Sequence, residues 1–226
     1  MNFAIQNKRI LVTQADEFMG PAICTFLQEQ GAIVLKQSGA ITSPEAPKNL
    51  IAECGEIDIL IANLALPAPS TRVQEVEEDE WKTVFDALVH PLPRLVRAVL
   101  PQMMERRSGK IIVIGSASAL RGINRASTYS AARGAQLSYV QAIGVELAAH
   151  NIQVNAIAQN FVDNPTYFPT ETQANPRFQE RLKREVPLGR LVAAHEDAAM
   201  VAYLCSDAAN CFVGQVFPLA GGWVIR

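Results

Sequence analysis

The 226-residue sequence lacks any excess of charge of one sign, and this absence excludes several classes of protein. Its 20 Lys and Arg residues stand against 22 Asp and Glu residues, so the net charge is −2. A chain so close to neutrality has no general electrostatic attraction for nucleic acid or for an anionic membrane surface. We therefore expect neither of these partners.

Long apolar runs are absent as well. No run approaches the ~18 apolar residues that a membrane helix needs. The N-terminal segment, MNFAIQNKRILVTQ, has no cationic stretch followed by a long apolar stretch and a small-residue cleavage site. Together these absences predict a cytoplasmic protein that does not cross or bind a membrane.

Cysteine and histidine are too few and too scattered to indicate disulfide or metal chemistry. The four cysteines are Cys24, Cys54, Cys205 and Cys211, and no two of them form a C-x-x-C pair. A domain of this size does not need disulfides for stability, so we expect free thiols. The three histidines do not have the spacing of a zinc site, and no metal ion is expected.

What the sequence does contain is an alternation of short apolar runs with longer helical patterns. Such alternation is typical of parallel strands joined by crossover helices. Because the runs are apolar throughout, both faces of the sheet should be buried under helices. The predicted strands are Arg9–Thr13, Ala32–Leu35, Ile57–Ala62, Lys110–Ile114, Ile152–Ala158 and Gly214–Leu219. We predict a three-layer, doubly wound, Rossmann-like α/β fold, with residues 1–226 forming one domain because no linker or repeat divides the chain.

The helical patterns have recognisable ends. Predicted helices span Gly20–Gln30, Thr71–Arg107, Ser127–His150 and about Glu196–Leu204. Gly31 and Asn151 should end the first and third of these in a left-handed conformation, whereas Pro91 and Pro93 must kink or divide the second. The stretch Asn160–Pro176 has no clean period and predicts a long loop at the carboxyl edge of the sheet, where loops usually carry function.

One spacing brings chemically useful side chains together. Ser116 follows the fourth predicted strand, and Tyr129 and Arg133 are four residues apart on the next helix, so they share a helix face. A guanidinium near a phenol favours the phenolate, which can then accept a proton near neutral pH. These residue types also occur for packing reasons, so the spacing alone leaves the interpretation open.

The pattern S-x12-Y-x3-R, at Ser116, Tyr129 and Arg133, resembles the S-x12-Y-x3-K of the short-chain dehydrogenase/reductase superfamily. The resemblance extends over nearly the whole chain, including Asn63-Leu64-Ala65 and the closing Gly221-Gly222. Two departures stand out. Arg133 replaces Lys, and Thr13 to Gly20, TQADEFMG, replaces the glycine-rich turn that binds a dinucleotide pyrophosphate.

The sequence of this turn disfavours a nicotinamide cofactor. Gln14 and Phe18 add bulk at two glycine positions, and Asp16 and Glu17 add negative charge beside them. No acidic residue lies between Glu29 and Glu45, where one should bind the adenosine ribose. We therefore expect no cofactor.

Both departures together resemble the halohydrin dehalogenases, cofactor-independent relatives of the short-chain dehydrogenases. Their motifs T-x4-F/Y-x-G and S-x12-Y-x3-R occur here at Thr13, Phe18 and Gly20 and at Ser116, Tyr129 and Arg133. The resemblance implies a catalytic triad of Ser116, Tyr129 and Arg133. It implies halide or substrate binding by Thr13, Phe18, Gln159, Asn160, Phe161, Val162, Tyr167 and Phe168.

The implied reaction is the conversion of a vicinal haloalcohol to an epoxide, a halide ion and a proton, with the reverse opening of epoxides by azide, cyanide or nitrite. The resemblance also implies a homotetramer, in which the helices at 71–107 and 127–150 pair between subunits. Two alternatives remain open, an NADP-dependent reductase with an atypical phosphate loop and an inactive binding module on the same fold.

Other polar residues give weaker signals. His90 lies near the position of a helical Asn in the dehydrogenase proton relay and is a further site candidate. Ser118 and Ser130 neighbour the triad. Asp16, Glu17 and the run Glu75–Glu80 are interpreted as solvated faces, His150 as the end of a helix, and His195 as the residue before the last helix.

Overall fold

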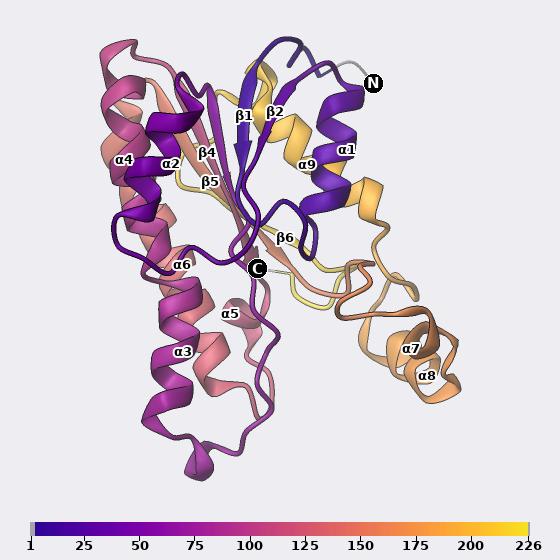
Figure 1. Cartoon of the computed structure of the whole chain (residues 1–226). Helices are drawn as coiled ribbons and strands as arrows, with labels where there is room; N and C mark the ends of the chain where they lie inside the picture. Colours follow the sequence, from indigo (N-terminus) through magenta and orange to yellow (C-terminus); the bar gives the residue numbers. More distant parts are fainter. Residues whose placement is uncertain (1–2, 226) are drawn as a thin grey trace.

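The computed structural model describes residues 3–225 and contains one six-stranded sheet in which all neighbouring strands are parallel (Figure 1). The strands are β1 (Arg9–Val12), β2 (Ile33–Lys36), β3 (Ile59–Ala62), β4 (Gly109–Ser116), β5 (Ile152–Gln159) and β6 (Val216–Leu219). Their order in the sheet is β2-β1-β3-β4-β5-β6. The predicted Rossmann-like fold is confirmed, and the order changes direction between β1 and β3, where such sheets bind ligands.

Burial is complete only in the inner strands. Every residue of β3 and β4 is buried, whereas β2 and β6, at the two edges, are partly exposed along their length. Ile33 at the start of β2 is 44% exposed. The expectation of burial on both faces therefore holds for the centre of the sheet, and the edge strands depart from it because they have a neighbour on one side only.

Helices cover both faces of the sheet. On one face lie α1 (Gly20–Glu29) and α9 (Ala194–Cys205), and on the other lie α2 (Ala46–Cys54), α3 (Glu78–Leu88), α4 (Pro91–Glu105) and α6 (Ser127–Ala148) (Figure 1). Each face has its own apolar core. Met19, Ile23 and Val201 belong to the first core, and Leu88, Val99 and Leu137 to the second.

The predicted helix ends are largely correct. Gly31 has φ +82° after α1, and Asn151 has φ +58° after α6, so both residues adopt the left-handed conformation expected of a helix stop. The segment Thr71–Arg107 is divided rather than kinked, because α4 starts at Pro91, whose missing N–H costs nothing in a first turn. Its beginning holds only the 3-10 turn η1 (Val73–Glu75).

Several elements were not predicted. They are α2, α5 (Ser118–Arg121), α7 (Thr170–Ala174), α8 (Pro176–Glu185) and the 3-10 turn η2 (Asp207–Ala209). The stretch 160–176 is therefore not entirely a loop. The Pro and Asn residues that suggested a loop start a helix instead, since the Asn175 side chain accepts a hydrogen bond from the Arg177 N–H at 2.9 Å. Helices α7 and α8 stand away from the sheet (Figure 1).

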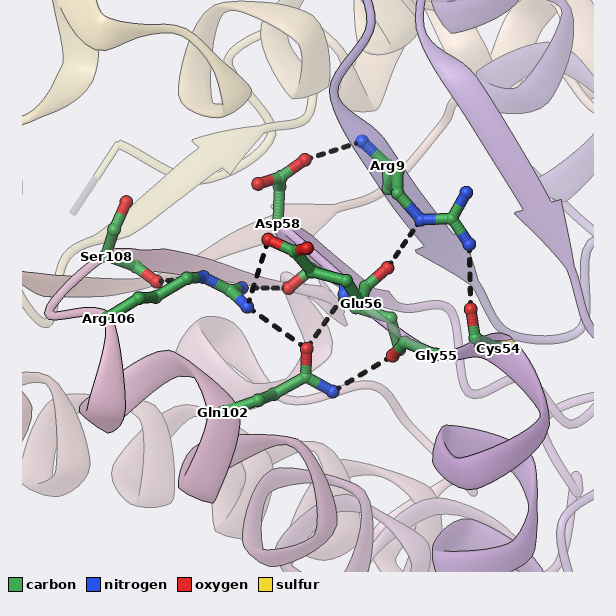
Figure 2. A network of polar contacts seen from close by, with 9 residues as sticks. Arg9, Cys54, Gly55, Glu56, Asp58, Gln102, Arg106 and Ser108 are labelled. Carbon is green, nitrogen blue, oxygen red and sulfur yellow. Dashed lines mark hydrogen bonds and ion pairs between the residues drawn. The ribbon is translucent and has the colours of Figure 1, made fainter.

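The end of the sheet opposite the site is held by a polar network (Figure 2). The Arg9 guanidinium donates to the carbonyls of Cys54 and Glu56 at 2.8 and 2.7 Å. The Gln102 side chain accepts from the Ile57 N–H at 2.8 Å and donates to the Gly55 carbonyl at 3.2 Å. These bonds satisfy the backbone between α2 and β3, so this end of the molecule is a structural anchor.

The longest helix, α6, presents its polar residues to the interior. Tyr129, Arg133 and Gln136 are buried on the face that packs against β4 and β5. Across residues 3–225, no helix combines the length and the apolar character needed to cross a membrane.

Candidate functional site

A cavity of about 330 Å³ opens at the carboxyl ends of the central strands. This volume lies at the lower end of the range of roughly 300–1,000 Å³ that is usual for small-molecule sites. Ten of the eleven predicted site residues line it, namely Phe18, Ser116, Tyr129, Arg133, Gln159, Asn160, Phe161, Val162, Tyr167 and Phe168.

The sheet places the two strand-end residues side by side. Ser116 is the last residue of β4 and pairs in register with Gln159, the last residue of β5. The Ser116 Oγ accepts hydrogen bonds from the Ser118 N–H at 3.2 Å and from the Ser118 hydroxyl at 2.9 Å. Because both bonds are accepted, the Ser116 hydroxyl proton is free to donate into the cavity. Ser118 thus orients Ser116.

Arg133 is fixed beside the phenol of Tyr129. Its Nη1 donates to the Ile114 carbonyl at 3.1 Å and to the Gln136 Oε1 at 2.9 Å, and the Gln136 amide donates to the Leu88 carbonyl at 2.6 Å. The Arg133 Cζ lies 5.0 Å from the centre of the Tyr129 ring, and its buried Nε has no partner among the described residues. A permanent charge is therefore held in a dry position next to the phenol.

Opposing influences act on the Tyr129 hydroxyl. Burial is the largest and raises its pKa, but the charge of Arg133 and hydrogen bonds with Tyr167, Arg133 and Ser116 outweigh burial and lower the pKa of Tyr129 below its usual value. Tyr167 behaves in the opposite way. Its own burial and the charge of Tyr129 raise the pKa of Tyr167, so it stays protonated while Tyr129 ionises.

Tyr167 closes the site over Tyr129. Its hydroxyl donates to the Leu66 carbonyl at 2.9 Å and lies 3.5 Å from the Tyr129 hydroxyl. Its ring packs against that of Phe18, with the ring centres 5.2 Å apart. The segment after β5 thus contacts both the triad and the β1–α1 turn.

Another part of the cavity wall carries groups that are suited to a small anion. Phe18 and Met19, next to the positive end of the α1 dipole, line it on one side, and Phe161 and Val162 line it on the other. The Phe161 N–H donates to the Asn160 Oδ1 at 2.9 Å. Within the described part of the chain the buried Val162 N–H has no acceptor, which makes it an available donor.

Behind this wall lies an ionisable group that the sequence did not reveal. Asp197 is fully buried on α9, and its Oδ1 accepts a hydrogen bond from the Gln159 amide at 2.6 Å. Its Oδ2 has no partner among residues 3–225. Desolvation by burial raises the pKa of Asp197 to about 7, only partly opposed by the bond from Gln159.

The β1–α1 turn does not fit a dinucleotide pyrophosphate. The N–H groups of Gln14 and Ala15 donate to the Gln37 Oε1 at 3.0 Å and to the Gln37 carbonyl at 2.8 Å. The Gln14 side chain, in turn, accepts from the Ala65 N–H at 2.6 Å and donates to the Ala65 carbonyl at 3.2 Å. Amides that would cradle a phosphate are already bonded within the protein.

This turn keeps a left-handed backbone conformation, which glycine favours, at positions where other residues stand. Gln14 and Phe18 have φ +43° and φ +49°, a left-handed conformation that costs a non-glycine residue roughly 1–2 kcal/mol. Gly20 alone is retained. A Cβ there would lie 2.5 Å from the Gln14 carbonyl oxygen, so Gly20 serves the close packing of α1 on the turn.

Some predicted residues lie elsewhere. Thr13 does not line the cavity, because it is fully buried and its hydroxyl donates to the Asn63 carbonyl at 3.3 Å. His90 is a surface residue, 49% exposed, with its Nδ1 2.9 Å from Asp86. Glu80 is not simply solvated, since it accepts from the Thr128 hydroxyl at 2.7 Å. His195 lies inside α9 rather than before it.

Sequence reasoning missed the cavity residues that come from distant segments. Ile123, Asn164, Arg181 and Trp223 line the cavity, and none belongs to a motif with functional spacing. Trp223 is 9% exposed, and a tryptophan is generally expected to be buried. No other pattern in the sequence points to these four residues. In residues 3–225 no group of three or more His, Cys, Asp or Glu side chains could hold a metal ion.

Known proteins similar to this chain include reductases and dehalogenases. Residues 2–224 match a family described as enoyl-(acyl carrier protein) reductase. The 3-oxoacyl-(acyl-carrier-protein) reductase FabG of Salmonella typhimurium is 29% identical, with 97% of this chain and 98% of that protein covered. The chain therefore belongs to the short-chain dehydrogenase/reductase superfamily.

Two similar solved structures are dehalogenases. A protein described as a dehalogenation enzyme is 31% identical, with a TM-score of 0.90 over 97% of this chain and 99% of that one. A halohydrin dehalogenase bound to ethyl (2S)-oxiran-2-ylacetate is 28% identical, with a TM-score of 0.88 over 97% and 98% of the two chains. An L-sorbose reductase from Gluconobacter frateurii, 22% identical with full coverage of both chains and a TM-score of 0.91, shares the fold.

Proposed function

We propose that this protein is a halohydrin dehalogenase, a lyase that converts a vicinal haloalcohol into an epoxide, a halide ion and a proton. The observation that carries the proposal is the buried set of Ser116, Tyr129 and Arg133 beside a β1–α1 turn whose amides are already bonded within the protein. The similarity to two dehalogenases supports it.

In the proposed reaction the substrate hydroxyl lies between Ser116 and Tyr129. The Ser116 hydroxyl donates to the substrate oxygen, and the Tyr129 phenolate, stabilised by Arg133, accepts the substrate proton. The resulting alkoxide oxygen attacks the neighbouring carbon from the side opposite the halogen. The carbon–halogen bond breaks, and its electron pair leaves with the halide. Because nucleophile and leaving group belong to one molecule, no covalent enzyme intermediate or water nucleophile is needed.

The leaving halide is placed at the wall formed by Phe18, Phe161 and Val162. The free Val162 N–H and the positive edges of the aromatic rings are suited to a large, weakly hydrated anion in a dry site. Asn160 and Gln159 border the same wall. By microscopic reversibility, azide, cyanide or nitrite bound here would open an epoxide in the reverse direction.

Halide release from 1,3-dichloro-2-propanol tests the proposal. We expect chloride and epichlorohydrin to appear in equal amounts without any added cofactor, and Tyr129→Phe to abolish turnover while leaving the fold intact. Tyr139→Phe, a partly exposed tyrosine on the same helix, is the matched control and should retain activity. An absence of halide from a broad panel of haloalcohols would contradict the proposal.

The main alternative is a reductase, which the 29% identity to FabG brings forward. Titration with NADPH separates the two, because Trp223 lines the cavity and its fluorescence should respond to a ligand bound there. Tight, saturable NADPH binding would favour the reductase. We expect bromide, and not NADPH, to change the fluorescence.

A further inference from the structure

The charged residues in the cavity wall all have the same sign. Among the residues that the structure describes, Arg133 and Arg181 line it, and no Asp or Glu does. The whole chain carries a net charge of −2, so this positive cavity is a local feature. Arg133 is buried beside Tyr129, whereas the side chain of Arg181, on α8, is 54% exposed. Arg133 is the arginine that lowers the pKa of Tyr129.

Arg181 keeps most of its hydrogen-bonding capacity unused. Its Cζ lies 5.6 Å from the centre of the Phe161 ring, which places the guanidinium over a cavity-lining aromatic residue. Its Nε donates to the Glu185 Oε2 at 3.1 Å. Among residues 3–225, its Nη1 and Nη2 have no partner. The fork of N–H groups that suits a carboxylate is thus available.

The neighbouring carboxylate does not neutralise this charge. Glu185 also accepts from Arg184 at 2.9 Å, so one carboxylate is shared by two guanidinium groups. Burial raises the pKa of Glu185, but the hydrogen bonds from Arg184 and Arg181 outweigh burial and lower it. Glu185 therefore stays ionised. Arg181, Arg184 and Glu185 together therefore carry a net positive charge, and Arg181 lines the cavity.

A second cation flanks the same aromatic wall. Arg121 donates to the Trp223 carbonyl at 2.6 Å, and its Cζ lies 4.6 Å from the centre of the Trp223 ring. Trp223 in turn meets Phe161 edge-on, with the ring centres 6.2 Å apart. Two guanidinium groups therefore border one pair of cavity-lining rings, and their fields add at the cavity.

We propose that Arg181 binds an anionic group of the substrate, so that the preferred substrates are short haloalcohols bearing a carboxylate. This inference rests on the proposed dehalogenase function and names its substrate class. The carboxylate accepts from the Arg181 Nη groups while the carbinol oxygen lies at Ser116 and Tyr129. With 4-chloro-3-hydroxybutanoate, the 3-hydroxyl proton passes to Tyr129, the oxygen bonds to C4, and chloride leaves with the C4–Cl electron pair. The products are 3,4-epoxybutanoate, chloride and a proton.

The test compares this acid with its methyl ester, which differs by one charge. We expect the wild-type kcat/KM to be at least about tenfold higher for the acid, the low end of what a charge-assisted hydrogen bond contributes. Arg181→Gln should remove most of that preference, because it should lower the kcat/KM for the acid far more than the kcat/KM for the ester. Lys183→Gln, which removes the same charge from the same helix without touching the cavity wall, should keep the preference.

Two further measurements do not depend on the folding of Arg181→Gln. Glu185→Gln removes the shared counter-charge and should increase the ratio of acid to ester kcat/KM. In the wild-type enzyme the same ratio should fall as ionic strength rises, since the half-exposed guanidinium is screened by salt. A ratio near one, unaffected by salt or by Glu185→Gln, would overturn the assignment.

The results distinguish a failure of the proposed dehalogenase function from a failure of the role proposed for Arg181. If 1,3-dichloro-2-propanol releases chloride but the acid is no better than its ester, the dehalogenase proposal stands and the role of Arg181 is wrong. If neither the dichloro compound nor the acid nor the ester releases chloride, both proposals fall together.

Discussion

Tyr129 shows how neighbouring residues change the pKa of a single side chain. Burial alone would keep its phenol neutral, yet the charge of Arg133 and hydrogen bonds with Arg133, Tyr167 and Ser116 reverse that preference. The balance depends on Gln136, which holds Arg133 in place through a bond of 2.9 Å. The pKa of Tyr167 is raised, so Tyr167 keeps its own proton, and its hydroxyl lies 3.5 Å from that of Tyr129.

We predict that halide release rises with pH through a single ionisation whose midpoint lies below about 10, the usual pKa of tyrosine. Arg133→Gln should move this midpoint upward and lower the rate near pH 8 by about tenfold or more, because each pKa unit changes the phenolate fraction about tenfold. The measurement is kcat against pH.

Arg97→Gln is the control for this prediction, since it removes an exposed charge from α4, away from the cavity. It should leave the midpoint unchanged. If Arg133→Gln and Arg97→Gln gave the same pH profile, Arg133 would have no influence on the pKa of Tyr129.

Asp197 makes a prediction about stability rather than rate. Below about pH 4 its carboxyl is protonated in both the folded and the unfolded chain. As pH rises towards the folded pKa of about 7, only the unfolded chain releases the proton, so the free energy of unfolding falls. Above pH 7 the loss is complete and amounts to on the order of 4 kcal/mol, at about 1.4 kcal/mol per pKa unit.

Asp197→Asn removes this titration and preserves the size of the side chain. The stability of the variant relative to the wild type should increase between about pH 4 and pH 7 and stay constant above pH 7. Urea unfolding at a series of pH values measures the difference. A difference that does not vary with pH would exclude a raised pKa for Asp197.

At the scale of elements, the junction of β1 with α1 decides which ligand the fold can take. The turn keeps left-handed backbone at Gln14 and Phe18. The Gln14 side chain bonds to the backbone of Ala65, after β3, and the Phe18 ring packs against that of Tyr167. Gly20, which serves packing alone, is the glycine that remains. In this chain the β1–α1 turn therefore forms one wall of a small cavity.

We predict opposite effects for two Gly→Ala changes. Gly20→Ala should lower the free energy of unfolding by about 1–3 kcal/mol, because the added Cβ would lie 2.5 Å from the Gln14 carbonyl oxygen. Gly134→Ala, where a Cβ meets nothing within 4 Å in the middle of α6, should raise it by up to about 1 kcal/mol. Denaturant unfolding of both variants checks the signs. Equal effects would mean that α1 is free to move away from the turn.

At the scale of the whole molecule, the two ends of the sheet have separate tasks. The amino ends are held by the network around Arg9 and Gln102, which bonds backbone to side chains (Figure 2). The carboxyl ends carry the cavity, whose wall contains arginines and, within residues 3–225, no Asp or Glu side chain. The cavity wall is therefore locally positive, although the net charge of the chain is −2.

We predict that the protein assembles as a homotetramer through α3, α4 and α6. Trp81 on α3 and Val145 on α6 are 43% and 73% exposed, which is consistent with apolar contacts between subunits. Val145→Glu should dissociate the assembly when measured by light scattering. Val73→Glu, at an equally exposed position outside these helices, should not. A wild-type protein that scatters as a monomer would contradict the prediction.

The sequence by itself determined the sheet, the main helices and the closeness of Tyr129 to Arg133, because each is a local pattern. Apolar runs mark strands, Gly31 and Asn151 mark helix ends, and the spacing of Tyr129 and Arg133 places both on one helix face. Short elements such as α7 and α8 were not predicted, since Pro and Asn signal a helix start and a loop equally well.

Only the tertiary structure decided what surrounds the triad. The Thr13 side chain is buried and donates to the Asn63 carbonyl, whereas the His90 side chain is exposed to solvent. Arg181 and Trp223 line the cavity although they lie far along the chain from the triad. The raised pKa of Asp197 likewise depends on burial by α9 and on a bond to Gln159. Burial and contact between distant segments arise when the chain packs, so no local pattern of residues encodes them.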